Sequence, residues 1–111
     1  MQFTRTYTRP NTSIPFHIDL RSQEVTDFYE TEYISNGQLT EEITYSEDGL
    51  VMTIIQHWID DPEIILSWMN HPITMAWFEQ RDNYNAENGI IKSPSRYEYV
   101  IGGKIMQGVA P

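Results

Sequence analysis

Three polar residues are spaced so that they can meet on one face of a predicted sheet. Glu41 and Gln56 face each other across a predicted hairpin, and Arg5 can join them from the first strand. A buried carboxylate needs a partner, and a guanidinium group binds carboxylates well. One interpretation is that Arg5 anchors the acidic head group of a ligand while Glu41 orients it. The alternative is a structural ion pair at the sheet edge or at a dimer interface.

The histidines do not have the spacing of metal ligands. His17, His57 and His71 form neither an H-x3-H nor an HExxH motif, and the chain has no cysteine, so the sequence predicts no metal site and no cofactor. His71 stands at a predicted helix break that faces the presumed cleft. An imidazole there could act as a base or hydrogen-bond donor, which makes His71 the catalytic candidate. The alternative is that it caps a helix end.

The aromatic residues are the third source of possible chemistry. Three Trp and five Met give a wide, adaptable apolar surface, although most such residues are core by default. Such a lining suits a pocket between sheet and helices that holds a fatty-acid-like chain or a planar aromatic group. The predicted ligand-binding residues are Arg5, Phe28, Tyr33, Trp58, Trp68, His71 and Phe78.

Alternating side chains predict the strands that position these residues. The turn signal Asp48-Gly49 separates two alternating runs, 38–46 and 50–59, and so predicts a hairpin. Its register pairs Tyr45 with Met52, Ile43 with Ile54, Glu41 with Gln56 and Leu39 with Trp58. The other predicted strands are 2–9 and 95–101.

Two helices are predicted between the strands. Residues 21–35 repeat apolar residues at helical spacing after Ser22, a suitable N-cap. The second helix begins with Asp61 as N-cap and Pro62 at its first position, and Pro72 should break or kink it. The turn-rich residues 82–89 are expected to end it.

The order β-α-β-β-α-β predicts an α+β, ferredoxin-like antiparallel sheet with two helices on one face. We expect one domain, residues 1–101, followed by a C-terminal tail, residues 102–111. The free face of the sheet then needs a cover, and the simplest one is a second copy of the chain in a homodimer.

Composition excludes several partners. The 16 acidic and 7 basic residues give a net charge of −9, and the bases are scattered, so no nucleic-acid partner and no anionic membrane surface is expected. No run approaches the length of a membrane span, and no apolar N-terminal run has signal-peptide length. A cytoplasmic protein is the default expectation.

The stretch from Trp58 to Phe78 resembles the antibiotic-biosynthesis-monooxygenase family of dimeric α/β-barrel proteins. It has a strand-end Trp, the acidic helix start Asp60-Asp61, Trp68, the break His71-Pro72 and then Phe78. The resemblance implies a dimeric ferredoxin-like fold. Haem-degrading members have an iron-ligating histidine ten positions after the helix Trp, where this chain has Phe78, so the resemblance does not extend to haem degradation.

Three functions remain open on the sequence. The leading hypothesis is a homodimeric small-molecule-binding protein with an apolar cavity between sheet and helices. The first alternative is a cofactor-independent monooxygenase-type enzyme that uses Trp68, His71 and a Tyr. The second is an assembly protein that binds a partner through its sheet face or tail.

Overall fold

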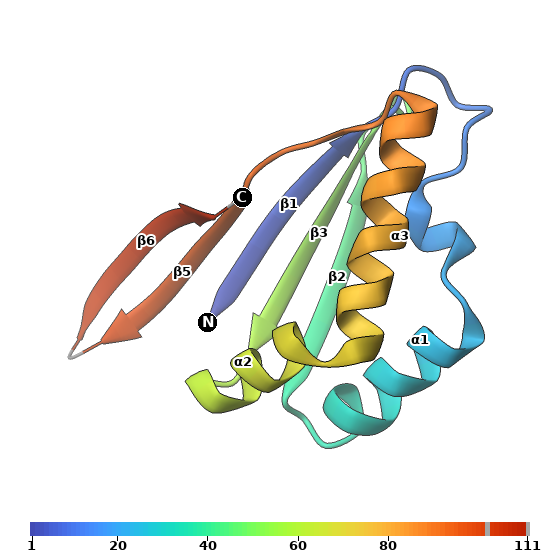
Figure 1. Ribbon diagram of the computed structural model, residues 1–111. Coiled ribbons are helices and arrows are strands. Elements are labelled where there is room, and N and C mark those ends of the chain that lie inside the picture. Colours follow the sequence, from blue (N-terminus) through green and yellow to red (C-terminus); the bar gives the residue numbers. More distant parts are fainter. Residues whose placement is uncertain (102, 111) are drawn as a thin grey trace.

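An antiparallel six-stranded sheet forms the frame of the computed structural model, which describes residues 1–101 and 103–110 (Figure 1). The strands lie in the order β2-β3-β1-β5-β6, and β4 also pairs with β1. The first four strands in this order, β2, β3, β1 and β5, have the predicted ferredoxin-like arrangement. The strands are β1 (Gln2–Thr8), β2 (Leu39–Tyr45), β3 (Val51–Trp58), β4 (Ile91–Lys92), β5 (Ser95–Ile101) and β6 (Lys104–Ala110).

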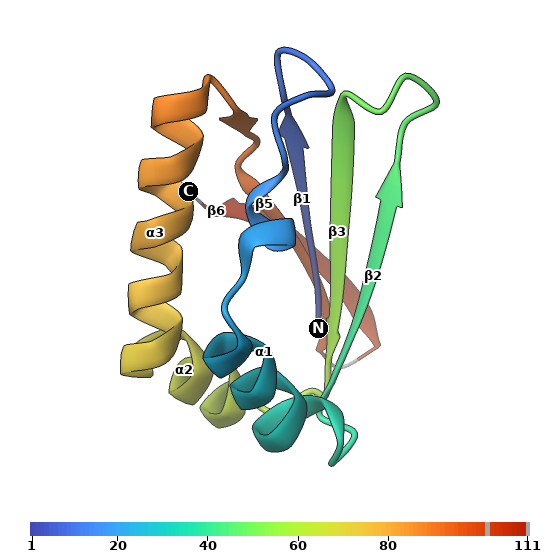
Figure 2. The same ribbon diagram turned by 90° about the vertical axis from the view of Figure 1, so that its right-hand side faces the viewer.

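The helices lie on one side of the sheet, and the loop that follows β1 runs between α3 and the sheet (Figure 2). Ser22 and Asp61 cap α1 and α2 as predicted, and α2 gives way to α3 at the predicted break before Pro72. The helical elements are a 3-10 turn η1 (His17–Leu20), α1 (Gln23–Tyr29), a π-helical turn η2 (Glu30–Ile34), α2 (Pro62–Asn70) and α3 (Pro72–Asn88).

The hairpin of β2 and β3 has the predicted register. All four predicted pairs occur, from Leu39 with Trp58 to Tyr45 with Met52. Glu41 and Gln56 therefore share the helix-facing side of the sheet, and β1 pairs with β3 so that Arg5 stands beside Ile54 on that same side.

Helix α3 is longer than the sequence predicted. Residues 82–88, expected to be turn, continue the helix to Asn88, and Gly89 ends it with a φ of 68°. Trp77, Arg81 and Asn85 follow one another at intervals of four residues and are all buried, so tertiary packing holds this segment helical despite its turn-type composition.

The segment expected to be a tail contains β6, which forms a hairpin with β5. Gly108 in β6 lies beneath the ring of Tyr97, and a Cβ atom at position 108 would collide with the ring and the hydroxyl group of that tyrosine. The bare glycine backbone is thus the surface on which the tyrosine packs.

Gly108→Ala is expected to weaken this hairpin, because the tyrosine ring must leave its place to admit the methyl group. We expect the free energy of opening the hairpin to fall by about 1–3 kcal/mol, measured by hydrogen exchange of the β5 and β6 amides. Met106→Ala, at a position 43% exposed in the same strand, is the matched control and should change it little. Equal protection in both variants would show that the ring contact does not stabilise the hairpin.

The core consists of two hydrophobic clusters. One lies beneath α1 and α2 and contains Trp58, Trp68 and Tyr33; the other contains Tyr7, Phe16, Met52, Ile54 and Ile90 at the opposite end of the sheet. Among the described residues, no helix has the length and apolar character needed to cross a bilayer.

Candidate functional site

A small cavity of about 30 Å³, partly open to solvent, lies between the sheet and the helices. Side chains from β1, β2, β3, η1, α1 and α3 converge on it. The sequence predicted an apolar cavity in this place, whereas the cavity found is lined largely by polar and charged groups. They are Arg5, Tyr7, His17, Ile18, Arg21, Tyr29, Glu41, Ile54, Gln56, Trp77, Phe78 and Arg81.

Arg5 is the central charged group of this cavity. Its Nε donates a hydrogen bond to Ser95 Oγ at 2.5 Å, and its Cζ lies 5.6 Å from the centre of the Phe78 ring. No carboxylate of the described residues lies within 4.0 Å of its guanidinium nitrogens. Burial lowers the pKa of Arg5, because desolvation disfavours its charged form.

Arg81 and Arg21 bring two further positive charges to the cavity. Arg81 is 7% exposed, lies over the Phe78 ring and pairs with Asp82 at 3.0 Å, but the Asp82 side chain is itself 58% exposed. Arg21 Nη1 lies 3.9 Å from Glu41 Oε2. Three guanidinium groups thus face two carboxylates, one of them largely in water, and the site carries an excess of positive charge.

His17 lies deep in the same cavity and is electrically neutral at physiological pH. Burial, followed by the charges of Arg81, Arg21 and Arg5, lowers its pKa to about 3. Its ring packs 4.5 Å from the Tyr7 ring and 5.5 Å from the ring of Trp77. The site therefore combines cationic hydrogen-bond donors with one neutral imidazole.

Glu41 and Gln56 are connected to each other and to the core. Gln56 Nε2 donates to Glu41 Oε1 at 3.2 Å, and Gln56 Oε1 accepts from Trp58 Nε1 at 3.4 Å. This chain of hydrogen bonds links the rim of the cavity, where Glu41 is partly exposed, to the buried indole.

The predicted site residues lie in three places in the structure. Arg5 and Phe78 line the cavity, together with Glu41 and Gln56. His71 is the N-cap of α3, where its Nδ1 accepts a hydrogen bond from the Ile73 N–H at 3.1 Å, and its ring lies 4.3 Å from that of Phe28. The remaining four, Phe28, Tyr33, Trp58 and Trp68, belong to the hydrophobic cluster beneath α1 and α2.

Three polar residues of the cavity were missed by sequence reasoning: His17, Arg21 and Arg81. The first two come from the irregular segment between β1 and α1, which has no periodicity to place its side chains. Arg81 carried a usable signal, because it follows Trp77 by four residues and so continues the buried stripe of α3.

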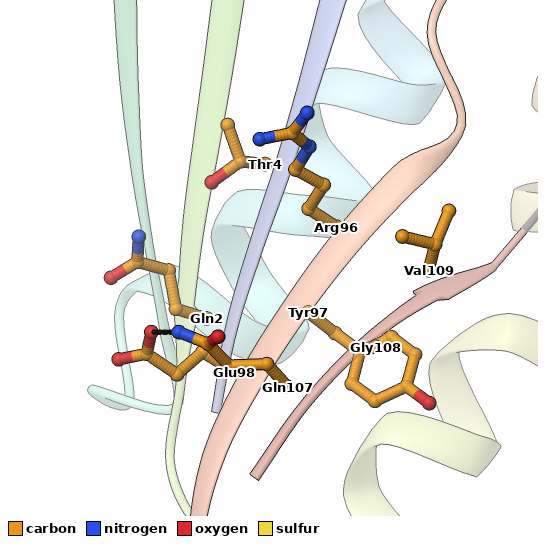
Figure 3. Close-up of a pocket in the computed structure, with 8 residues that line it drawn as sticks. All are labelled: Gln2, Thr4, Arg96, Tyr97, Glu98, Gln107, Gly108 and Val109. Atoms are coloured by element: carbon orange, nitrogen blue, oxygen red, sulfur yellow. Dashed lines mark hydrogen bonds between the residues drawn. The ribbon is translucent and has the colours of Figure 1, made fainter. Parts of the chain in front are cut away.

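A larger hollow of about 530 Å³ lies on the opposite, open face of the sheet (Figure 3). Gln107 Nε2 donates to Glu98 Oε2 at 2.8 Å across its floor, and Arg96 and Thr4 line it further along. Its charged lining residues, Arg96 and Glu98, are exposed. Within the part of the chain that the structure describes, the cavity around Arg5 gathers charged groups that are largely withdrawn from water, so it is the candidate site.

The described residues contain no cluster of three or more His, Asp or Glu side chains that could hold a metal ion. What the cavity can do chemically therefore rests on its arginines, its neutral histidine and its aromatic walls. This combination suits the capture of a small organic anion.

Comparison with solved structures gives a match over nearly the whole chain. A crystal structure from Deinococcus radiodurans, described provisionally as an antibiotic biosynthesis monooxygenase, superimposes with a TM-score of 0.51 over 96% of this chain and 99% of the other, at 12% sequence identity. The chain shares that protein's fold. No protein-family model matches the sequence, and no curated protein matches it either.

Proposed function

We propose that the protein binds a small organic acid in the cavity between sheet and helices, with Arg5 holding the acidic head group. The observation that carries this proposal is the half-buried Arg5, whose guanidinium group has no carboxylate partner within 4.0 Å among the described residues. A charge that is partly removed from water without a counter-ion is costly, and an anionic ligand would reduce that cost.

The size of the cavity defines which part of the ligand enters it. A volume of about 30 Å³ admits a head group of a few atoms and no more. An apolar remainder, fatty-acid-like or planar and aromatic, would extend past Glu41 at the rim. There Ile43 and Tyr45, 37% and 53% exposed, continue along the same face of β2.

Binding without turnover is the function that these side chains favour. The protein from Deinococcus radiodurans that shares this fold is described provisionally as a monooxygenase, so oxygenation of a substrate is the alternative function. The hypothesis for such an enzyme used Trp68 and His71, but neither residue lines the cavity, and His71 is engaged in capping α3.

The test is the affinity of phenylacetate compared with its neutral analogue 2-phenylethanol, measured by isothermal titration calorimetry. Charge-assisted hydrogen bonds are worth about 1.5–3 kcal/mol, so we expect the acid to bind about 10-fold to 150-fold more tightly. Arg5→Met should abolish this preference with little net change in stability, because it removes a charge that has no carboxylate partner but also the hydrogen bond to Ser95 Oγ. Arg96→Met, on the open face, should preserve it. Equal affinities for acid and alcohol, or an unchanged preference in Arg5→Met, would refute the proposal.

We further propose that the protein is a cytoplasmic homodimer that buries the open face of its sheet. Val100, Ile105 and Val109 stand on this face of the β5–β6 hairpin with exposures of 54%, 65% and 63%. β6 belongs to the segment 102–111, which we infer to be an addition to the domain of residues 1–101. Together with the hollow of about 530 Å³, these side chains offer a second copy both apolar contacts and room for its own side chains.

Ile55→Lys tests the dimer, since Ile55 is half-buried on the open face of β3 beside Thr4 and Glu42. Burying an ammonium group at an interface is costly even beside the Glu42 carboxylate, because both charges lose water. The variant should therefore sediment as a 13.0 kDa monomer while the unmodified chain sediments at twice that mass. Met75→Lys, at a position 56% exposed on α3, is the control and should remain dimeric. An unmodified chain that sediments as a monomer at high concentration would contradict the dimer.

A further inference from the structure

His17 is a buried polar group with a hydrogen bond unmade. It is 4% exposed, and its Nδ1 is buried without a hydrogen-bond partner among the described residues. The rings of Tyr7 and Trp77 hold it on two sides, at 4.5 and 5.5 Å, so the imidazole is fixed in the cavity wall. Buried polar groups in native proteins nearly always have partners, and an exception of this kind needs an explanation.

The chemistry of a neutral imidazole says what the missing partners must be. One nitrogen carries a proton and donates, and the other carries a lone pair and accepts. The carboxylate proposed for Arg5 can only accept a hydrogen bond, so it serves the donor nitrogen at most. With the proton on Nε2, Nδ1 is the accepting nitrogen and needs a hydroxyl or N–H group, and no side chain of the described residues supplies one.

The cavity also limits how far apart the ligand's two polar groups can be. Arg5 and His17 line a single space of about 30 Å³, which is roughly the room of two water molecules. A carboxylate and a donor that both enter this space must sit on the same or adjacent carbon atoms of the ligand.

We propose that the ligand is a 2-hydroxy acid with an apolar substituent, whose carboxylate meets Arg5 and whose hydroxyl donates to His17. This inference rests on the proposed function and specifies its ligand class. Arg5 supplies affinity for any small carboxylate. His17 is a specificity residue, because leaving its lone pair unmatched costs binding free energy whenever the ligand lacks the hydroxyl.

The test compares three carboxylates that differ only in the substituent on the carbon next to the carboxylate: phenylacetate, mandelate and 2-methoxy-2-phenylacetate. Isothermal titration calorimetry should show one enantiomer of mandelate binding about 10-fold more tightly than phenylacetate. The methoxy compound, which cannot donate, should lose that advantage. His17→Phe should bind mandelate and phenylacetate alike, and His57→Phe, at an exposed position on the open face, should keep the difference.

The outcomes separate this inference from the function on which it rests. If phenylacetate binds through Arg5 but mandelate has no advantage over it or over the methoxy compound, the hydroxy-acid inference is overturned and the organic-acid function stands. If no carboxylate binds, both are overturned. The comparison of the three ligands with the unmodified chain needs no variant to fold.

Discussion

Trp68→Ala is expected to lower the free energy of unfolding by about 3–5 kcal/mol. Trp68 is 1% exposed, and its ring packs 4.9 Å from that of Trp58, 5.5 Å from that of Phe78 and 6.1 Å from that of Tyr29. Alanine would leave a large cavity among these rings, which neighbouring elements can fill only in part. Urea unfolding followed by far-UV circular dichroism measures the change.

The control for Trp68 lies one residue away on the same helix. Met69 is 45% exposed, and Met69→Ala should change the free energy of unfolding by no more than about 0.5 kcal/mol. Trp68 belongs to the core cluster and does not line the cavity. A Trp68→Ala protein that is as stable as the unmodified chain but no longer binds phenylacetate would contradict this assignment.

Between pH 7 and pH 4 the unmodified protein should lose about 3 kcal/mol more stability than His17→Phe. The pKa of His17 is lowered from 6.5 to about 3 in the folded state, by burial and then by the charges of Arg81, Arg21 and Arg5, against a small opposing effect of Asp82. Below pH 6.5 the unfolded chain therefore takes up a proton that the folded chain refuses. The stability that His17 contributes is present above pH 6.5 and is lost as the pH falls toward 3.

Urea unfolding at a series of pH values measures this difference. The carboxylates titrate in both proteins, so only the gap between the two curves reports His17. Met75→Phe, at a position 56% exposed on α3, provides the control, and this change should leave the acid dependence unaltered. Parallel curves for the unmodified protein and His17→Phe would show that the buried imidazole is not held neutral.

The hairpin shows what the sequence could predict well. A strong two-residue turn signal, flanked by alternating runs, allows one register that keeps the apolar set together, and that register is present from Leu39 to Tyr45. It correctly placed Glu41 opposite Gln56. The pairing of β1 with β3 then brings Arg5 to the same side, so half of the polar cavity could be anticipated from strand patterns.

The remaining residues of the cavity come from segments whose local sequence does not determine their backbone conformation. Residues 82–88 have the composition of a turn, yet packing of Arg81 and Asn85 against the rest of the protein keeps them helical. His17 is placed by an irregular loop that also accepts a hydrogen bond from the Tyr84 hydroxyl through the carbonyl of Pro15. Such long-range contacts follow from the folded structure and leave no periodic trace in the sequence.

For a related reason, the sequence could not separate aromatic core residues from aromatic residues that line a pocket. Trp58, Trp68 and Tyr33 have the size and spacing of a ligand pocket, but the same properties make them good core residues. In this chain they pack in one hydrophobic cluster beneath α1 and α2. Burial alone does not distinguish a core residue from a residue of the ligand site. The observation that selects the candidate site is the charge of Arg5, which has no carboxylate partner within 4.0 Å among the described residues.

The most direct test of the account is a proton–nitrogen NMR spectrum of the arginine side chains during titration with phenylacetate. The Nε–H of Arg5, assigned by its loss in Arg5→Met, should shift in a saturable way, while 2-phenylethanol should leave it unmoved. The Nε–H of Arg96 on the open face should stay unchanged in both titrations. Shifts confined to Arg96, or an Arg5 signal that does not respond to the acid, would contradict the claim that this cavity binds an organic anion.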